Sequence, residues 1–472
     1  MQKVSYKRHI FFVFVLCLCT WWSVVSDTSP TSHIDFTKLT LVLPEELERE
    51  EYYRRDVGVD SIIYFDIPNS QPQAHASSIV NVSAVSEADF MLLYFAGSRE
   101  GARDVGIYQS FFTFEAPFKQ KNIEARRRES LHYKKQEAQK GKWVGFKPNE
   151  LRNEPSHIGA WSEPKLLLDA PMLSHLSGKF IKKLGNPVSF VDTQGRVHLF
   201  VVGVSMGGWA TSKIYWLILE SLEQGGLRYV KELHLSPFLN FSFLVRTPPL
   251  LKSDGGFILP IYHELASKYP LLLDFSPSLE LTAIMRPTDL KSQLQPSFVP
   301  LDSHSALGVY RNHKAYNNTL FVSECDSQCK NPKLKSNLKN YDASSVLFNM
   351  RKAIYIAHNE PSTPQGNARE NLRIYVLDKT TLAQEMFKEV EFWFPLTLDT
   401  LPHNEVSYPS VATNKDFVHI AYTYGRKHIR TALVPKDVLD RHTSLPPIID
   451  IEHIQNLDDI PYEWNTKTFE GE

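Results

Sequence analysis

The sequence predicts an all-β protein folded as a six-bladed β-propeller, and three observations lead to that fold class. First, aromatic residues make up 12% of the chain and proline occurs 29 times, which suits many short strands joined by turns. Second, a hairpin unit recurs, built from an apolar run, a polar turn and another apolar run. Third, one or two further β-like runs separate successive units at roughly the spacing of propeller blades. A two-sheet sandwich is the alternative, although six similar units fit it poorly.

The hairpin units lie in a predicted propeller spanning residues 61–434. They are SSIVNVSAVSEADFMLLYFAG, NPVSFVDTQGRVHLFVVGV, PPLLKSDGGFILPIYHE, QPSFVPLDSHSALGVYR, ASSVLFNMRKAIYIAHN and YPSVATNKDFVHIAYTY. Asp- and Gly-containing stretches at residues 192–195 and 254–256 supply the turn chemistry that a hairpin needs.

Residues 1–26 have the pattern of a signal peptide. Lys3, Lys7 and Arg8 precede an apolar run over residues 10–25, and small residues before Asp27 offer a cleavage site. The run is short for a membrane span, which favours a cleaved signal peptide, and an uncleaved type II membrane anchor is the alternative. We therefore expect a secreted or lumenal protein, with a membrane as partner only if this segment is retained.

Two further features agree with a secretory route. Glycosylation sequons occur at Asn81, Asn240 and Asn317. Beyond the targeting segment the only cysteines are Cys325 and Cys329, for which a local disulfide is the natural pairing. A zinc site needs more ligands than this pair offers.

Three segments do not fit the repeat. Residues 27–60 form a mixed polar leader that we expect to pack on the propeller. Residues 119–154 form a charged segment, which we interpret as a solvent-exposed insertion between two strands of the first blade or, alternatively, as a basic partner-binding arm. Residues 435–472 form an acidic tail. A formal net charge of −1 over 472 residues gives no electrostatic basis for a nucleic-acid partner.

The stretch with most chemical character is residues 91–110, MLLYFAGSREGARDVGIYQS. Two β-type runs flank a polar loop, so Arg99 and Asp104 are expected near each other at one end of a sheet. An ordinary surface ion pair is the simplest explanation for two such residues. Asp104 is also a residue type that closes turns by accepting backbone N–H groups.

The loop reads Gly-Ser-Arg-Glu-Gly-x-x-Asp, and the other matching stretches, placed one per blade, are HASSIV, GNPVSF, PPLLKSDGGFILPIYHE, QPSFV, AREN and EVSYPSVATNKDFVHIAYTYGRK. In this order the chain resembles the sialidase (neuraminidase) superfamily, in its sialidase-like BNR-repeat branch. The resemblance covers residues 75–430 and implies the six-bladed fold.

Read residue by residue, the resemblance implies an active site. Asp104 matches the acid/base and Tyr408 the nucleophile, while Arg99 lines the site. Arg311 and Arg369 match the second and third arginines that bind the sugar carboxylate. The implied activity is exo-hydrolysis of terminal sialic acid, or a related acidic sugar, from glycoconjugates with retention.

The chemistry of the substrate explains these residue types. Guanidiniums bind a carboxylate bidentately and stay charged at working pH. A carboxylate nucleophile would be repelled by the sugar acid, so sialidases use tyrosine, assisted by a base. An aspartic acid of raised pKa then protonates the leaving oxygen. We expect no metal and no organic cofactor.

The sequence also departs from the family pattern. His75 stands near the place of the first carboxylate-binding arginine, and Arg246 is a candidate replacement cation. Gln295 stands where a glutamate activates the tyrosine, so Glu264 or Glu405 would have to act instead.

Each residue also has a structural explanation. Arg311 and Arg369 could form ion pairs at blade edges, Tyr408 could pack between blades, and His75 could be a hydrogen-bonded core histidine. Two other functions therefore stay open: hydrolysis of a different anionic sugar, and non-catalytic glycan binding on the same scaffold.

Overall fold

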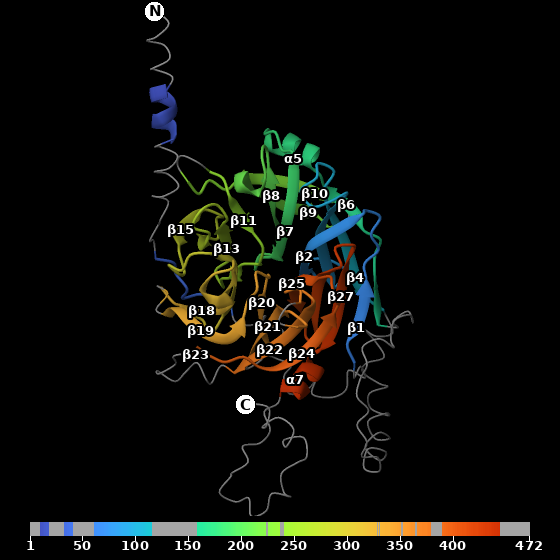
Figure 1. Ribbon diagram of the computed structural model, residues 1–472. Coiled ribbons are helices and arrows are strands. Elements are labelled where there is room, and N and C mark those ends of the chain that lie inside the picture. The colour runs from blue at the N-terminus through green and yellow to red at the C-terminus, as the bar shows by residue number, and fades with distance from the viewer. Residues whose placement is uncertain are drawn as a thin grey trace, which may run out of the picture.

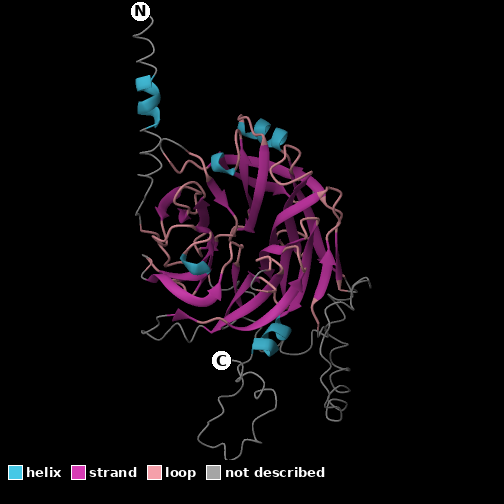
Figure 2. Ribbon diagram, in the orientation of Figure 1, coloured by secondary structure: helices cyan, strands magenta, loops and turns pink. Residues whose placement is uncertain are grey.

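The computed structural model describes residues 10–17, 33–40, 61–115, 158–222, 225–236, 240–327, 329, 331–350, 353–363, 366–378 and 389–443. In these ranges six β-sheets stand in a ring (Figures 1 and 2). The predicted six-bladed β-propeller is therefore confirmed. The insertion at residues 119–154 lies outside the described residues, as do most of residues 1–26 and the tail beyond residue 443.

Each predicted hairpin forms the inner part of one blade, and the extra β-like runs form the outer strands. Blade one consists of β2 (Gln73–Asn81), β3 (Phe90–Gly97), β4 (Gly106–Phe114) and an outer edge of β5 (Gly159–Trp161) and β6 (Lys165–Leu168). Blade two consists of β7 (Lys183–Val191), β8 (Val197–Val204), β9 (Ser212–Ser221) and β10 (Gly226–Glu232). Helix α5 (Ala170–Ser177) links these two blades, and the short helix η2 (Trp209–Thr211) precedes β9.

Blades three and four depart from a plain four-stranded sheet. Blade three has a divided inner edge and consists of β11 (Phe243–Val245), β12 (Leu250–Leu251), β13 (Phe257–His263), β14 (Tyr269–Phe275) and β15 (Leu281–Met285). Blade four consists of β16 (Gln293–Pro300), β17 (Ala306–Asn312), β18 (Thr319–Cys325), β19 (Asn331–Lys339) and the parallel edge strand β23 (Glu389–Val390), with η3 (Tyr316–Asn318) before β18.

The last two blades complete the ring. Blade five consists of β20 (Val346–Met350), β21 (Ala353–Glu360), β22 (Asn371–Asp378) and β24 (Trp393–Thr400). Blade six consists of β25 (Val406–Thr413), β26 (Phe417–Tyr424), β27 (His428–Pro435) and, from the other end of the chain, β1 (Ile63–Asp66).

Blade six closes the ring because an early strand completes a late sheet. β1 pairs antiparallel with β27 as the outermost strand. Arg430 reinforces this pairing with two bonds to Asp66, from Nε at 2.6 Å and from Nη2 at 3.0 Å. A bidentate arginine–carboxylate pair adds geometric specificity to the strand pairing.

The core lies between neighbouring blades, where both faces of most sheets are covered. Between blades two and three, for example, the ring of Trp216 meets those of Phe275 at 5.2 Å and Phe257 at 5.8 Å. Because aromatic side chains fill these wedges, the high aromatic content of the sequence follows from the architecture.

The leader and the tail each contribute a packed piece. Leu39 of the leader is buried and forms an isolated bridge with Lys252, and Ile34 and Phe36 join the same apolar cluster. Helix α7 (Lys436–Thr443) begins the segment that the sequence marked as an acidic tail, and its Leu439 is fully buried. Residues 10–17 are helical, and no helix in the described residues has the length and apolar character to span a membrane.

Irregularities of the inner strands position the site. Register shifts interrupt β2, β7, β16 and β25 near their starts. A residue with left-handed φ marks each shift, and another precedes β20: Ala76, Asn186, Gln295, Asp342 and Tyr408, with φ of 52°, 37°, 44°, 61° and 56°. A bulge turns one side chain out of the pleat, and strained backbone of this kind clusters at functional sites.

Candidate functional site

The turned-out side chains meet on the axis of the ring. Arg246, between β11 and β12 of blade three, donates to the carbonyls of Ser77 in blade one and of Tyr408 and Pro409 in blade six. Blade three lies across the ring from blade six, so these contacts can form only at the centre. Arg246 thereby joins residues of blades one, three and six in one cluster around Tyr408.

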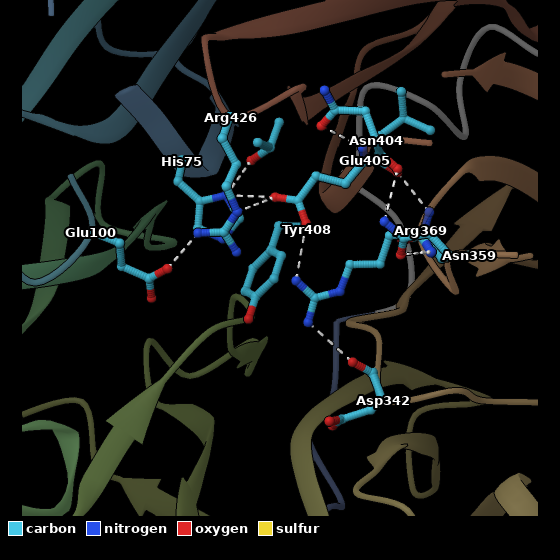
Figure 3. A network of polar contacts seen from close by, with 12 residues as sticks. His75, Glu100, Asp342, Asn359, Arg369, Asn404, Glu405, Tyr408 and Arg426 are labelled. Atoms are coloured by element: carbon cyan, nitrogen blue, oxygen red, sulfur yellow. Dashed lines mark hydrogen bonds and ion pairs between the residues drawn. The ribbon is translucent and has the colours of Figure 1, made fainter. Parts of the chain in front are cut away.

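Tyr408 lies in the middle of this cluster (Figure 3). Its hydroxyl accepts a hydrogen bond from Arg311 Nη1 at 3.0 Å and a longer one from Gln295 Nε2 at 3.5 Å. The guanidiniums of Arg246 and Arg369 lie 5.2 and 5.3 Å from the ring centroid, within cation–π range. Tyr408 stays partly exposed, so solvent and ligands can reach it.

A chain of ion pairs surrounds the tyrosine. Arg311 Nε donates to Asp342 at 2.7 Å. The Glu405 carboxylate bridges two guanidiniums, with Oε2 3.1 Å from Arg369 Nη1 and Oε1 2.6 Å from Arg426 Nε. Arg426 Nη1 then reaches Glu100 at 2.6 Å. Figure 3 shows this network bringing together residues of blades one, five and six.

The charges of the cluster do not cancel. Four guanidiniums, those of Arg246, Arg311, Arg369 and Arg426, face the three carboxylates Glu100, Asp342 and Glu405. His75 adds no charge at neutral pH. With a neutral phenol the cluster carries one excess positive charge, which suits an anionic ligand.

This excess charge governs the ionisation of Tyr408. Burial alone would raise the pKa of the phenol, but the guanidiniums of Arg311 and Arg369 outweigh burial, and the pKa is lowered. Burial likewise favours the neutral form of Asp342, yet Arg311 and His313 hold the pKa of that carboxyl below its usual value. The cluster therefore favours negative charge at both groups.

His75 is a core residue in this structure. Its Nδ1 lies 2.9 Å from Thr423 Oγ1, and its ring centroid lies 4.3 Å from that of Tyr408. Burial, together with the nearby guanidiniums of Arg426 and Arg369, holds the pKa of His75 well below its ordinary value. A buried neutral imidazole supports the tyrosine ring but cannot bind a carboxylate as a cation would.

Arg246 is also a structural element rather than a free clamp. It is 2% exposed, and its Nη atoms are used by the three carbonyls named above. Burial lowers the pKa of Arg246 to about 10, which leaves it charged at neutral pH. It thus adds positive potential under the tyrosine ring, and its place among the substrate-binding residues is corrected to one of support.

The structure brings neither candidate base to the tyrosine hydroxyl. Glu405 is engaged by Arg369 and Arg426, and in Figure 3 the hydroxyl of Tyr408 points away from its carboxylate. Glu264 follows β13, and among the described residues no contact joins its carboxylate to Tyr408. Among the described residues, the Tyr408 hydroxyl therefore contacts hydrogen-bond donors, those of Arg311 and Gln295, and neither glutamate.

Apart from Glu100, the β3–β4 loop, residues 98–105, lies outside these contacts. Asp104 is exposed and accepts from Ser98 N at 2.8 Å and Ser98 Oγ at 2.9 Å, which closes the loop. These hydrogen bonds lower the pKa of Asp104, so the raised pKa expected of a general acid is wrong for this conformation. Arg99 is exposed and, in the described structure, makes no side-chain bond within the cluster.

The opposite side of the cluster is built mainly from neutral polar groups. Tyr262 of β13 lies 3.4 Å from both Asn186 Nδ2 and Gln295 Nε2. Trp209 packs against Gly185, where an added Cβ would come within 2.5 Å of its ring. Polar but neutral groups of blades two, three and four thus face the charged groups of blades four, five and six.

The remaining predicted sites lie outside the cluster. The amides of Asn81 and Asn240 donate to the chain, to Thr413 O at 2.9 Å and to Leu233 O at 2.8 Å, while Asn317 is exposed. Cys325 and Cys329 form a disulfide. No group of three or more His, Cys, Asp or Glu in the part of the chain that the structure describes could hold a metal ion.

Three cluster residues were absent from the sequence-based set: Glu100, Asp342 and Arg426. Glu100 belongs to the loop signature, so it could have been considered. Asp342 precedes the fifth inner strand, β20, and shares the left-handed φ that Tyr408 has in the sixth. Arg426 lies in the β26–β27 turn, and no local pattern distinguishes it from an ordinary hairpin residue.

Comparisons with known proteins agree with this architecture. A family model described as a BNR repeat-like domain matches residues 88–420. No curated protein sequence matched the chain. Among solved structures, a Hadza microbial sialidase aligns with a TM-score of 0.53 at 10% identity, over 79% of this chain and 69% of that one.

Two further solved structures have the same fold. A protein of unknown function from Dyadobacter fermentans aligns with a TM-score of 0.51 at 10% identity, over 79% of this chain and 99% of that one. A leech intramolecular trans-sialidase aligns with a TM-score of 0.50 at 10% identity, over 85% and 73%. At this identity the structures establish shared architecture only. Because the family model spans most of the propeller, the chain belongs to the BNR repeat-like domain family, with the fold of sialidase-like propellers.

Proposed function

We propose that the protein is an exo-acting glycoside hydrolase that removes a terminal acidic sugar, sialic acid in the first place, from glycoconjugates. The observation that carries this proposal is the 3.0 Å bond from Arg311 to the Tyr408 hydroxyl, inside a cluster with one more guanidinium than carboxylates. A phenol between guanidiniums is the nucleophile that tolerates a carboxylate on the reacting carbon. The reaction would proceed with retention.

The residue roles follow from their positions. Tyr408 attacks the anomeric carbon, and Arg311 and Arg369, with Arg426 beside them, attract the sugar carboxylate. Asp104 serves as acid/base from the β3–β4 loop. Its hydrogen bonds with Ser98 must break before its carboxyl group can reach the leaving oxygen. Arg99, on the same loop, faces the aglycone side.

A second candidate is a non-catalytic propeller that binds acidic glycans. The absence of a carboxylate at the Tyr408 hydroxyl, within the described residues, favours it, as does the engagement of Asp104 by Ser98. Hydrolysis of a different anionic sugar, such as a hexuronide, is the third. All three share an anionic glycan as partner.

The test is release of a fluorescent aglycone from an aryl sialoside, with an aryl hexuronide beside it. We expect release from the sialoside, its loss in Tyr408→Phe, and its retention in the exposed matched control Tyr316→Phe. Saturable binding of the sialoside without release by any form would establish the glycan-binding candidate. Neither binding nor release of either sugar would refute an acidic-glycan function altogether.

We also propose that the protein follows the secretory route. An exposed sequon at Asn317 and the Cys325–Cys329 disulfide support this location. Expression in a secreting eukaryotic cell should yield an endoglycosidase-sensitive protein in the medium or lumen, and Asn317→Gln should remove one glycan. A protein that stays unglycosylated in the cytosol would contradict this location.

A further inference from the structure

The Tyr408 hydroxyl is surrounded by donors. Arg311 Nη1 and the Gln295 amide Nε2 both point N–H groups at the oxygen, at 3.0 and 3.5 Å. A guanidinium cannot accept a hydrogen bond, and an amide nitrogen only donates. No acceptor for the phenol proton is present among the described residues, although the lone pairs of the oxygen are satisfied. This pattern fits an oxygen that carries negative charge.

The charged groups around Tyr408 also favour its ionised form. Arg246, Arg311, Arg369 and Arg426 are cations, whereas His75 is neutral. Uncharged Tyr262 lies beyond Gln295, and the carboxylate of Glu264 acts on Tyr262. The nearby carboxylates are already paired, Glu405 with two guanidiniums, Asp342 with Arg311 and Glu100 with Arg426. Positive potential therefore predominates at the phenol.

We propose that Tyr408 acts as a preformed phenolate, ionised by the guanidiniums of Arg311, Arg369 and Arg246, and that Gln295 is a positioning residue standing where a base would otherwise act. This inference rests on the proposed function for its catalytic meaning, while its ionisation claim is independent of any sugar. A carboxylate at position 295 would repel the phenolate, whereas an amide donates to it.

The covalent step balances without a base. The phenolate oxygen forms a bond to the anomeric carbon, and the electron pair of the breaking glycosidic bond passes to the leaving oxygen. That oxygen takes one proton from Asp104. In the second step water attacks the anomeric carbon and gives one proton to the Asp104 carboxylate, while the bond to the tyrosine oxygen breaks. The phenolate is thereby regenerated, and no proton has to leave Tyr408 in the first step.

The first experiment is an ultraviolet difference titration of the folded protein against Tyr408→Phe. We expect one tyrosinate signal that appears at lower pH than the others and vanishes in the variant. Burial raises the pKa of Tyr262, Tyr310 and Tyr94, which keeps those residues out of the early signal. If no early tyrosinate depends on Tyr408, the phenolate proposal is overturned, whatever the enzyme assay shows.

The second experiment uses Gln295→Glu, an isosteric change of one functional group. We expect the early tyrosinate signal to move up by roughly one to three pH units, because a like charge disfavours the phenolate. The acidic limb of the activity on an aryl sialoside should move up by the same amount. Gln295→Met, which removes the amide without adding charge, should shift both by less.

A neutral Tyr408 would give the opposite result and overturn the proposal. The Gln295 amide in the opposite orientation would offer Oε1, which has no partner here, to a neutral Tyr408. In that case Gln295→Glu would raise turnover at neutral pH, as a restored base should, and leave no early tyrosinate to move. Inactivity of all forms with an intact early titration would reject the hydrolase while upholding the phenolate.

Discussion

The cluster around Tyr408 and the β3–β4 loop both carry charged residues, but they are built in opposite ways. In the cluster, bonds join residues from different blades, and Arg246 and Glu405 are buried. In the loop, Asp104 is exposed and bonds only a residue six positions away. Long-range bonds fix side chains in advance of a ligand, whereas a locally closed loop can rearrange without disturbing the fold.

One residue links the two regions. Glu100 leaves the loop and pairs with Arg426, which in turn pairs with Glu405 of the cluster. A change in the loop can therefore reach the cluster through this single carboxylate. Under the proposed function, the cluster would bind and attack the sugar, and the loop would supply the proton.

The largest effect should come from the loop's proton donor. Asp104→Ala should lower turnover of a sialoside with a poor leaving group by roughly 10²–10⁴-fold, the range for general acid catalysis. An aryl sialoside with a good leaving group should lose far less, because it needs no proton. Steady-state kinetics on the two substrates compare the loss of turnover with the poor and with the good leaving group. Equal losses on both would mean that Asp104 only closes the loop.

The next effect concerns stability and separates the regions directly. Arg246→Met should lower the free energy of unfolding by ~3–5 kcal/mol, because three buried carbonyls lose their donors. Arg99→Met, the matched change in the exposed loop, should stay within about 0.5 kcal/mol. Chemical denaturation of both variants measures the difference. A mild Arg246→Met would show that water replaces the guanidinium and that the cluster is less rigid than its bonds indicate.

These contrasts also show what the sequence could predict. The blades were predictable because each repeats an apolar hairpin with its own turn chemistry, which is local information. Tyr408, Arg311 and Arg369 were recognised from a resemblance, and the structure brings these three together. Asp104 was placed on the correct loop, but its exposure and its bonds to Ser98 depend on a conformation that a motif does not specify.

The remaining site residues depend on tertiary geometry. Arg426 enters the cluster because the last hairpin turn of blade six lies beside the start of β2, where its carbonyl accepts from Ala74 N. The sequence interval between them gives no hint of that proximity. Arg246 was predicted as a replacement cation. Its hydrogen bonds to carbonyl groups of two other blades show that it holds the backbone of the site in place.

A third prediction concerns the charge balance of the cluster. Glu405→Gln should leave Arg369 and Arg426 facing each other with less compensation. The free energy of unfolding should fall by about 2 kcal/mol, the range for hydrogen bonds to charged groups. The same change adds positive potential, so inhibition by free sialic acid should become several-fold stronger. Thermal melts and inhibition assays measure the two effects in one variant. Weaker inhibition together with lower stability would mean that Glu405 orients the arginines rather than limiting their charge.

The smallest expected effect is a pH dependence that again separates the regions. Asp342 has a pKa below its ordinary value of 3.8 because the guanidinium of Arg311 and His313 outweigh its burial. A carboxyl whose pKa is lowered by folding stabilises the protein fully above its unfolded value. That contribution is lost as the pH falls through the folded value. The stability contribution of Asp342 is therefore lost over a pH range that begins near pH 4 and extends downward.

Melting temperatures of the wild type and of Asp342→Asn, followed through this window, isolate the contribution of the cluster. We expect the gap between the two proteins to narrow as the pH falls, because protonation does to Asp342 what the substitution has already done. Asp104→Asn serves as the loop counterpart. The pKa of Asp104 is also lowered, chiefly by hydrogen bonds from Ser98 in an exposed loop, so the difference in melting temperature between Asp104→Asn and the wild type should be smaller at every pH. Other acids of lowered pKa, such as Asp192 at about 2, act equally in all three proteins and cancel in the comparison. A difference in melting temperature of equal size for both variants would show that cross-blade pairing adds no stability beyond what the two loop hydrogen bonds of Asp104 provide.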